Sequence, residues 1–305
     1  MALEAPLPVC LLGTTGVGKS DVAVALARRL GGEVVSCDAL AVYRRVPLLT
    51  ARPDAPSDVP HHLVDFVDPW DSYSASAFAR DSDRVVDDIG ARGRVAVVVG
   101  GTALYYKLWT RGMGPNVGRD AVFRADLEAL AAAEGPAALH ARLASVDPER
   151  AAALHRNDVR RLVRALEIVH ATGRKASELR NEWEAPLRRP LVVFGLRRGR
   201  DDLDARILAR ARRMLAQGLV AEVERLDALP TPPSGELAQA IGLADVRAHL
   251  RGQIDAATLQ ERLARATRRF SRRQATFFRQ LGEVRWVDLA PDEPPEVTAA
   301  RLPYP

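Results

Sequence analysis

The sequence lacks a cysteine framework and any long apolar run. Only Cys10 and Cys37 occur among 305 residues, and both fall in apolar stretches that predict buried strands. Two such cysteines support neither a disulfide scaffold nor a cysteine metal site, and they are typical of a reducing compartment. No apolar run approaches the ~20 residues that span a bilayer, and residues 1–6 lack the features of a signal peptide. We therefore expect a soluble, cytoplasmic protein with no membrane partner.

Lysine is scarce as well, so arginine carries nearly all the positive charge. Lys19, Lys107 and Lys175 are the only lysines, and the net charge is +5. Residues 188–280 hold 19 Arg against 10 Asp and Glu, a local excess of +9 that leaves −4 for the remainder. A basic C-terminal third favours an anionic partner.

Residues 13–20 fit the phosphate-binding loop pattern G-x-x-x-x-G-K-S. The apolar run 7–12 enters the loop and an amphipathic helical pattern over 22–30 leaves it, which is the strand–loop–helix setting that this motif requires. Glycines let backbone N–H groups turn toward phosphate oxygens, while a lysine adds a point charge and a serine hydroxyl binds Mg²⁺. We predict a phosphate site with Mg²⁺ as cofactor on Ser20, formed by Gly13, Thr14, Thr15, Gly16, Val17, Gly18, Lys19 and Ser20.

An acidic residue is missing where nucleotide hydrolases hold their metal. The strand predicted at 95–99 ends in Gly100-Gly101-Thr102 with no carboxylate at its tip, which disfavours an ordinary ATPase. The nearest equivalent carboxylate is Asp38, which follows the predicted strand 33–37. Because strand ends line the ligand crevice of an open α/β sheet, we expect residues 13–20, Asp38 and Thr102 to converge.

The length suits one large α/β domain with an additional lobe. A Pro/Gly-rich entry followed by Ala/Leu-rich helical patterns predicts a helical insertion over 112–185, and the apolar run 190–196 predicts a strand that returns to the sheet. The expected fold is a P-loop NTPase-like parallel sheet flanked by helices, built from 1–111 and 186–290. We expect residues 291–305 to form a loose tail.

Three predicted helices, at 157–170, 201–217 and 256–279, carry arginine stripes beside their apolar faces. For any one helix, a solvated charged face is the simpler interpretation. Three such helices on a chain with a phosphate loop favour a surface that binds a polyanion.

The chain resembles the bacterial tRNA dimethylallyltransferases, the IPP transferase family, over nearly its whole length. The resemblance lies in the order and spacing of the phosphate loop, Thr50-Ala51-Arg52-Pro53, His61-His62-Leu63-Val64-Asp65, Gly100-Gly101-Thr102-Ala103-Leu104-Tyr105, Asn157 to Glu167, and Arg272 to Phe278. It implies transfer of a dimethylallyl group from dimethylallyl diphosphate to N6 of the adenosine immediately 3′ of the anticodon. The implied partners are dimethylallyl diphosphate and the tRNA anticodon stem-loop, and the implied state is a monomer.

The resemblance also implies catalytic roles for individual residues. Asp38 corresponds to the general base for the N6 amine, Thr102 to a residue that helps hold the amine or the base, and Arg206 to the arginine that holds the diphosphate. The positions that correspond to tRNA contacts are Asp38, Ala39, Leu40, Ala41, Thr102, Arg124, Arg160, Arg161, Leu162, Val163, Arg164, Arg272, Arg273, Gln274 and Arg279.

One departure from the family pattern bears on specificity. The family usually shows Ser-Arg-Gln after the base, whereas this chain has Ala39-Leu40-Ala41, whose side chains form no hydrogen bonds with nucleotide edges. Two alternative functions therefore stay open. A P-loop kinase of a small molecule would bind ATP at the same loop but leaves the arginine helices and the insertion unexplained. An RNA-binding homologue with impaired catalysis fits the departure, although Lys19 and Asp38 are retained.

Overall fold

The computed structural model describes residues 5–53, 58–112, 120–178 and 185–305. The chain divides into two compact units, one formed by Met1–Trp109 with Arg189–Pro305 and the other by Thr110–Arg188. The second unit corresponds to the helical insertion that the sequence predicts, with boundaries that differ by a few residues.

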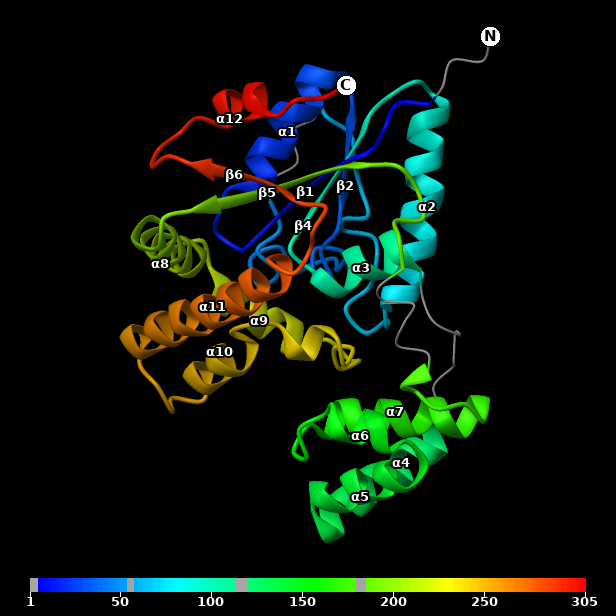
Figure 1. Ribbon diagram of the computed structural model, residues 1–305. Coiled ribbons are helices and arrows are strands. Elements are labelled where there is room, and N and C mark those ends of the chain that lie inside the picture. The colour runs from blue at the N-terminus through cyan, green and yellow to red at the C-terminus, as the bar shows by residue number, and fades with distance from the viewer. Residues whose placement is uncertain (1–4, 54–57, 113–119, 179–184) are drawn as a thin grey trace. The chain divides into compact units, whose positions relative to one another are not determined.

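The larger unit is built on a fully parallel six-stranded sheet with the strand order β3-β2-β4-β1-β5-β6 (Figure 1). The strands β1, β2 and β4 are buried along their whole length, as is typical of parallel strands that are covered on both faces. The register places Leu11 of β1 between Val99 of β4 and Phe194 of β5. The predicted parallel α/β fold is confirmed. The strands are β1 (Val9–Gly13), β2 (Glu33–Ser36), β3 (His61–His62), β4 (Ala96–Gly100), β5 (Val192–Arg198) and β6 (Arg285–Leu289).

Helices cover both faces of this sheet. Side chains alternate along β1, so Cys10 and Leu12 join the core cluster on one face while Val9 and Leu11 join the cluster on the other. Helices α1 and α12 lie on one face and α8 and α11 on the opposite face (Figure 1). The helices that begin in this unit are α1 (Lys19–Leu30), α2 (Ala75–Ala91), α3 (Ala103–Arg111), α8 (Arg200–Ala216), α9 (Leu219–Asp227), the 3-10 turn η2 (Leu237–Gln239), α10 (Leu243–Leu250), α11 (Ala256–Phe278) and α12 (Pro295–Arg301).

The C-terminal segment differs from the loose tail expected over 291–305. It contains α12, which packs on α1 and buries Ala299 and Leu302 in the core. Arg29 of α1 donates hydrogen bonds to the carbonyl oxygens of Ala300 at 3.0 Å and Leu302 at 2.7 Å. The burial of these two apolar side chains and the hydrogen bonds from Arg29 hold the segment in place.

The smaller unit is a helical bundle with its own apolar core. Its helices are α4 (Ala121–Glu134), α5 (Pro136–Val146), α6 (Pro148–Ala152) and α7 (Val159–Thr172). Leu127, Leu139, Leu143 and Leu162 are fully buried where these helices meet. Aspartates cap α4, α6 and α7 by accepting first-turn N–H groups, and Gly173 ends α7 with a left-handed φ of 66°.

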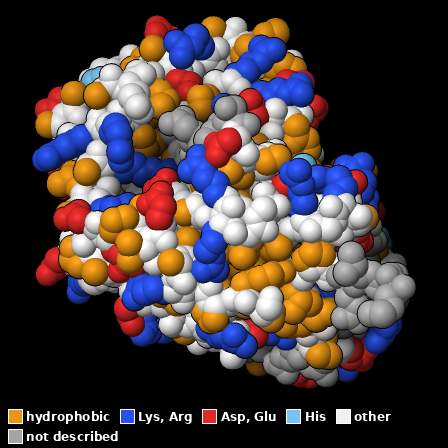
Figure 2. Space-filling model, turned by 90° about the horizontal axis from the view of Figure 1, so that it is seen from above, with side chains coloured by type: hydrophobic (Ala, Val, Ile, Leu, Met, Phe, Trp, Pro, Cys, Tyr) orange, Lys and Arg blue, Asp and Glu red, His pale blue; other side chains and the backbone are white. Residues whose placement is uncertain are grey.

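Many arginines of the larger unit are paired with acidic side chains at the surface. On the face shown in Figure 2, basic side chains lie among acidic ones and form no single continuous patch. Examples of such pairs are Arg28 with Asp58 and Arg247 with Asp227, each with a shortest N–O distance of 2.6 Å. No helix within the described residues is long and apolar enough to cross a membrane.

Candidate active site

Four neighbouring strands, β2, β4, β1 and β5, end at one edge of the sheet and lead into polar residues. Strand β1 leads into the loop 13–20, β2 into Asp38 and β4 into Thr102, while β5 ends in Arg198. Because the strands are parallel, their carboxyl ends share this edge, which is where α/β sheets bind ligands. The larger unit therefore brings together the groups that the sequence predicts to converge.

The phosphate loop depends on glycine at three positions. Gly16 and Gly18 have φ angles of 85° and 100°, a conformation that side chains disfavour. At Gly13, a Cβ atom would lie 2.6 Å from the carbonyl oxygen of Leu196 on the adjacent strand. Gly18 is also the N-cap of α1 and has no side chain that occupies the first-turn N–H groups. These N–H groups are therefore directed at any anion held by the loop.

Lys19 is a partly buried cation of the phosphate loop. Its Nζ donates a hydrogen bond to the carbonyl oxygen of Thr14 at 2.8 Å. Burial lowers the pKa of Lys19 to about 8, while the carboxylate of Asp38 acts in the opposite direction and Arg210 adds to the lowering. Burial also lowers the pKa of Arg210, which contacts Thr15 Oγ1 at 3.4 Å. A bound anion would stabilise both desolvated cations.

Two further arginines attach to the backbone of the loop. Arg206 Nε donates to the carbonyl oxygen of Gly16 at 3.0 Å, and Arg198 Nε donates to that of Val17 at 2.9 Å. A Cβ atom on Gly18 would lie 3.5 Å from an Arg206 terminal nitrogen and 3.8 Å from one of Arg198. Both guanidinium groups therefore lie beside the position where the loop would hold phosphate oxygens.

Asp38 is fixed through one of its two carboxylate oxygens. Oδ1 accepts the backbone N–H groups of Leu40 at 2.9 Å and Ala41 at 3.3 Å. Thr102 Oγ1 accepts the N–H of Ala39 at 3.0 Å. Within the part of the chain that the structure describes, no hydrogen bond engages Oδ2 of Asp38. The backbone of 39–41 thus holds the carboxylate in place and leaves its second oxygen open.

Gln274 of α11 supports the phosphate loop from the other side. Its Oε1 accepts the N–H of Thr15 at 2.8 Å, and its Nε2 donates to the carbonyl oxygen of Gly101 at 2.8 Å. The side chain is 5% exposed. Both polar groups are engaged inside the protein, so Gln274 positions the loop, and the tRNA contact that the resemblance implies for it stays a prediction.

Within the helical unit, several predicted tRNA contacts have structural roles. Leu162 and Val163 are buried in the bundle core, so their side chains are inaccessible to RNA. Arg124 forms two hydrogen bonds with the buried carboxylate of Glu167, at 2.9 and 2.7 Å. The predicted contacts on α7 whose side chains are at least partly exposed are Arg160, Arg161 and Arg164.

In the larger unit, the predicted tRNA contacts near α11 are mostly accessible. Arg272, Arg273 and Arg279 are exposed, and the guanidinium carbon of Arg273 lies 5.6 Å from the centre of the Phe270 ring. Ala41, by contrast, is 3% exposed. Exposed arginines of this kind are suited to phosphate contacts.

Sequence reasoning missed Arg198 and Arg210 as members of the site. Arg198 lies at the end of the strand that the apolar run 190–196 predicts, so the strand-end rule that selects Asp38 also selects it. Arg210 follows Arg206 by four residues and therefore shares its helix face. The role of Gln274 has no sequence signal of this kind, because its partner Thr15 is 259 residues away.

Ser20 is the one predicted metal ligand. It lies in the first turn of α1, and its hydroxyl forms no hydrogen bond within the described residues. No group of three or more acidic, histidine or cysteine side chains in that part of the chain is arranged to hold a metal. A single protein hydroxyl fits Mg²⁺ only where diphosphate oxygens and water complete the shell, which is the usual manner of Mg²⁺ binding.

Comparisons with known proteins identify the family of this chain. Residues 41–281 match the IPP transferase family. The chain is 41% identical to the tRNA dimethylallyltransferase of Stenotrophomonas maltophilia, with 97% of this chain and 95% of that protein covered. The tRNA isopentenylpyrophosphate transferase of Bacillus halodurans is similar in structure, with a TM-score of 0.70, 34% identity and coverage of 97% and 95%. A eukaryotic dimethylallyltransferase acting on tRNA gives a TM-score of 0.78 at 27% identity, covering 92% of this chain and 73% of that one. The chain therefore belongs to the IPP transferase family.

Proposed function

We propose that this protein transfers a dimethylallyl group from dimethylallyl diphosphate to N6 of the adenosine immediately 3′ of the anticodon in tRNA. The observation that carries the proposal is the placement of a cationic phosphate loop and the half-open carboxylate of Asp38 at one sheet edge. Membership of the IPP transferase family supports the same reaction.

The phosphate loop binds the leaving diphosphate. When the C1–O bond of the donor breaks and the N6–C1 bond forms, the diphosphate gains negative charge. Lys19, Arg198 and Arg206 meet this charge together with the first-turn N–H groups of α1. Cations and N–H donors that are already in place stabilise a developing charge without further reorganisation. Ser20 would hold Mg²⁺, which supplies further neutralisation of the diphosphate.

Asp38 acts on the nucleophile, which is the N6 amine of the adenosine. Its Oδ2 is the oxygen that takes the proton from N6, because Oδ1 is held by the N–H groups of Leu40 and Ala41. Thr102 keeps this segment in position through Ala39. A general base of this kind contributes about 10²–10⁴-fold to the rate.

The adenosine must leave its stack to reach this edge, and contacts to the RNA backbone offset that cost. The exposed arginines of α7 and α11 are the groups that would make those contacts. We place the protein in the cytoplasm as a monomer that binds the tRNA anticodon stem-loop and dimethylallyl diphosphate.

The experiment is incubation of the purified protein with Mg²⁺, radiolabelled dimethylallyl diphosphate and an unmodified tRNA that carries an adenosine 3′ of the anticodon. We expect label at that adenosine, and label formed about 10²–10⁴-fold more slowly with the Asp38→Asn variant. A parallel reaction contains ATP and small acceptors. Phosphate transfer from ATP without label in RNA would replace the proposal with a kinase, and tRNA binding without either reaction would indicate an impaired homologue.

A further inference from the structure

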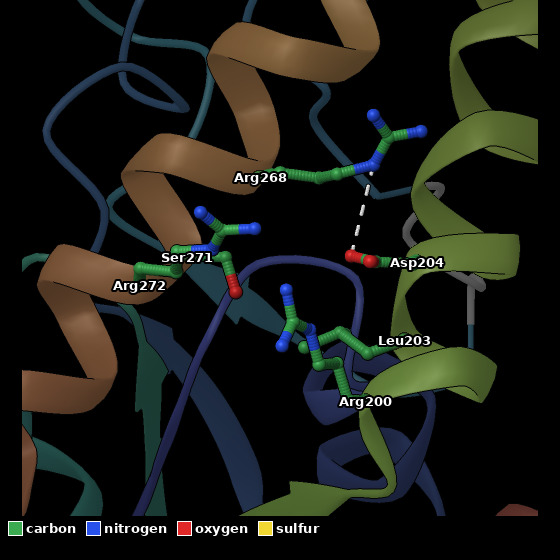
Figure 3. Close-up of a pocket in the computed structure, with 6 residues that line it drawn as sticks. All are labelled: Arg200, Leu203, Asp204, Arg268, Ser271 and Arg272. Atoms are coloured by element: carbon green, nitrogen blue, oxygen red, sulfur yellow. Dashed lines mark ion pairs between the residues drawn. The ribbon is translucent and has the colours of Figure 1, made fainter.

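A pocket of about 370 Å³ lies between α8 and α11, outside the group of residues assigned above to catalysis. Arg200 and Leu203 come from the first turn of α8, and Arg268 and Ser271 face them from α11 (Figure 3). The complete lining is Arg200, Leu203, Asp204, Arg268, Ser271 and Arg272.

The lining carries three guanidinium groups and one carboxylate. Arg268 Nε lies 3.7 Å from Asp204 Oδ1, which is an ion pair too long for a hydrogen bond. This Nε is buried and has no hydrogen-bond partner. The side chains of Arg200 and Arg272 form no hydrogen bond or ion pair within the described ranges. The pocket therefore holds an excess of positive charge and unused N–H donors.

Both walls of the pocket continue into the phosphate loop. On α8, Leu203 lies close to the loop, because a Cβ atom on Gly16 would be 3.3 Å from Leu203 Cδ1. Arg206, about one helical turn after Leu203, donates to the carbonyl oxygen of Gly16. On α11, Ser271 precedes Gln274, which accepts the N–H of Thr15. Leu203 therefore both lines the pocket and lies against the phosphate loop.

We infer that this pocket is a second diphosphate site, which takes the diphosphate group as it leaves the phosphate loop. This inference rests on the proposed function, which produces diphosphate at the neighbouring loop. A compact polyanion matches the lining because guanidinium groups bind phosphate oxygens with paired, charge-assisted hydrogen bonds. The Nε of Arg268 and the 4% exposed Ser271 are buried in the pocket wall, whereas Arg200 and Arg272 are exposed and are the guanidinium groups that an anion meets from solvent.

The test is isothermal titration of the purified protein with inorganic diphosphate in the presence of Mg²⁺. We expect two equivalents to bind. Lys19→Met removes the loop site and keeps one equivalent. Arg200→Gln weakens the other site by at least ~10-fold, because it deletes one charged donor from the set. Arg200 has no hydrogen-bond or ion-pair partner among the described residues, so its loss leaves none of their carboxylates unpaired, and thermal melting checks that the variant is folded. Arg212→Gln, an exposed arginine of the same helix, is the matched control and keeps both equivalents.

Several results would overturn the inference. One is a single equivalent that Lys19→Met abolishes, and another is two equivalents that Arg200→Gln leaves unchanged. A third is a single equivalent of diphosphate combined with weaker binding of an anticodon stem-loop by Arg200→Gln, which assigns the pocket to an RNA phosphate. The prenyl-transfer assay is read separately. Transfer with only one diphosphate site rejects this inference and keeps the proposed function, whereas two sites without transfer reject the function and keep the site.

Discussion

Gln274 of α11 accepts the backbone N–H of Thr15 at 2.8 Å and joins the last long helix of the larger unit to the phosphate loop. Its Nε2 also holds the carbonyl oxygen of Gly101, so one amide side chain connects two strand ends. The shape of the loop therefore depends on a residue that belongs to an entirely different part of the sequence.

Replacement of this amide tests the connection. Gln274→Ala should raise the KM for dimethylallyl diphosphate by about fivefold, because the loss of a net ~1 kcal/mol hydrogen bond at the loop loosens the N–H groups that bind the donor. The KM for tRNA should change much less. Gln280→Ala, at an exposed glutamine after the same helix, is the control and should match the wild-type protein. A KM effect confined to tRNA would show that Gln274 acts on RNA.

Asp38→Asn should lower kcat by about 10²–10⁴-fold, since asparagine keeps an oxygen for the N–H groups of Leu40 and Ala41 but takes up no proton. Single-turnover kinetics with labelled donor measure the effect, and filter binding measures tRNA affinity, which should stay within a few-fold. Substantial turnover combined with a large loss of tRNA affinity would reject Asp38 as the base.

Arg198→Gln should lower kcat/KM by about 10²-fold, because a charged donor close to the developing diphosphate is lost. It should also lower the free energy of unfolding by about 2 kcal/mol, because Asp202 loses a partner at 2.9 Å. The neighbouring Arg197 pairs with Asp288 at the exposed surface, so Arg197→Gln is the matched control with near wild-type values. Equal effects of both variants on kcat/KM would remove Arg198 from the site.

Diphosphate binding should depend on the charge of Lys19. The pKa of Lys19 in the unliganded protein is about 8. Its side chain is therefore charged below pH 8 and loses the charge as the pH rises above that value. We expect the Kd for diphosphate to increase by about tenfold per pH unit above 8. Lys19→Arg keeps its charge throughout this range and should lack that additional pH dependence. Identical profiles for the two proteins, measured by titration calorimetry from pH 7 to 9.5, would contradict the prediction.

Stability at low pH should depend on Glu33, a buried carboxylate held by Arg92, Arg94 and His62. The hydrogen bond from Arg92 is the largest cause that lowers the pKa of Glu33 to about 2, from an ordinary value of 4.5. The stabilisation of the folded protein by the Glu33 charge is therefore complete above pH 4.5 and is lost as the pH falls through 2.

In urea unfolding at pH 7, Glu33→Gln should cost about 2 kcal/mol, a figure reduced for the exposure of the arginines to solvent. The difference from the wild-type protein should shrink on acidification below pH 4.5. Asp58→Asn removes an exposed pair with Arg28 and should leave the free energy of unfolding close to that of the wild-type protein. A difference that is constant with pH would show that the charge of Glu33 has no part in it.

The sequence was sufficient to predict the parts of the site that lie near one another along the chain or follow a periodic rule. The phosphate loop is a contiguous motif, and Asp38 and Thr102 follow apolar runs that form adjacent parallel strands. The parallel sheet and the helical insertion have similarly local signals, which are apolar runs of strand length and helical periodicity.

What escaped prediction depends on contacts between distant segments. Gln274 appears as one polar residue on an arginine-rich helix until the packing of α11 places it beside Thr15. The helix α12 is only seven residues long, and its stability comes from burial against α1. Arg124 resembles any exposed arginine in sequence, yet the buried Glu167, three helices further along the chain, determines its role.

The turn after β2 divides two tasks between different atoms of the same three residues. The N–H groups of Ala39, Leu40 and Ala41 hold Thr102 and the carboxylate of Asp38, the proposed base, and every amino acid except proline supplies an N–H group. The side chains of the partly exposed Ala39 and Leu40 can therefore change while the carboxylate of Asp38 stays in place, whereas the buried Ala41 leaves room only for a small side chain. We expect single substitutions at Ala39 or Leu40 to alter contacts with RNA without loss of the proposed base.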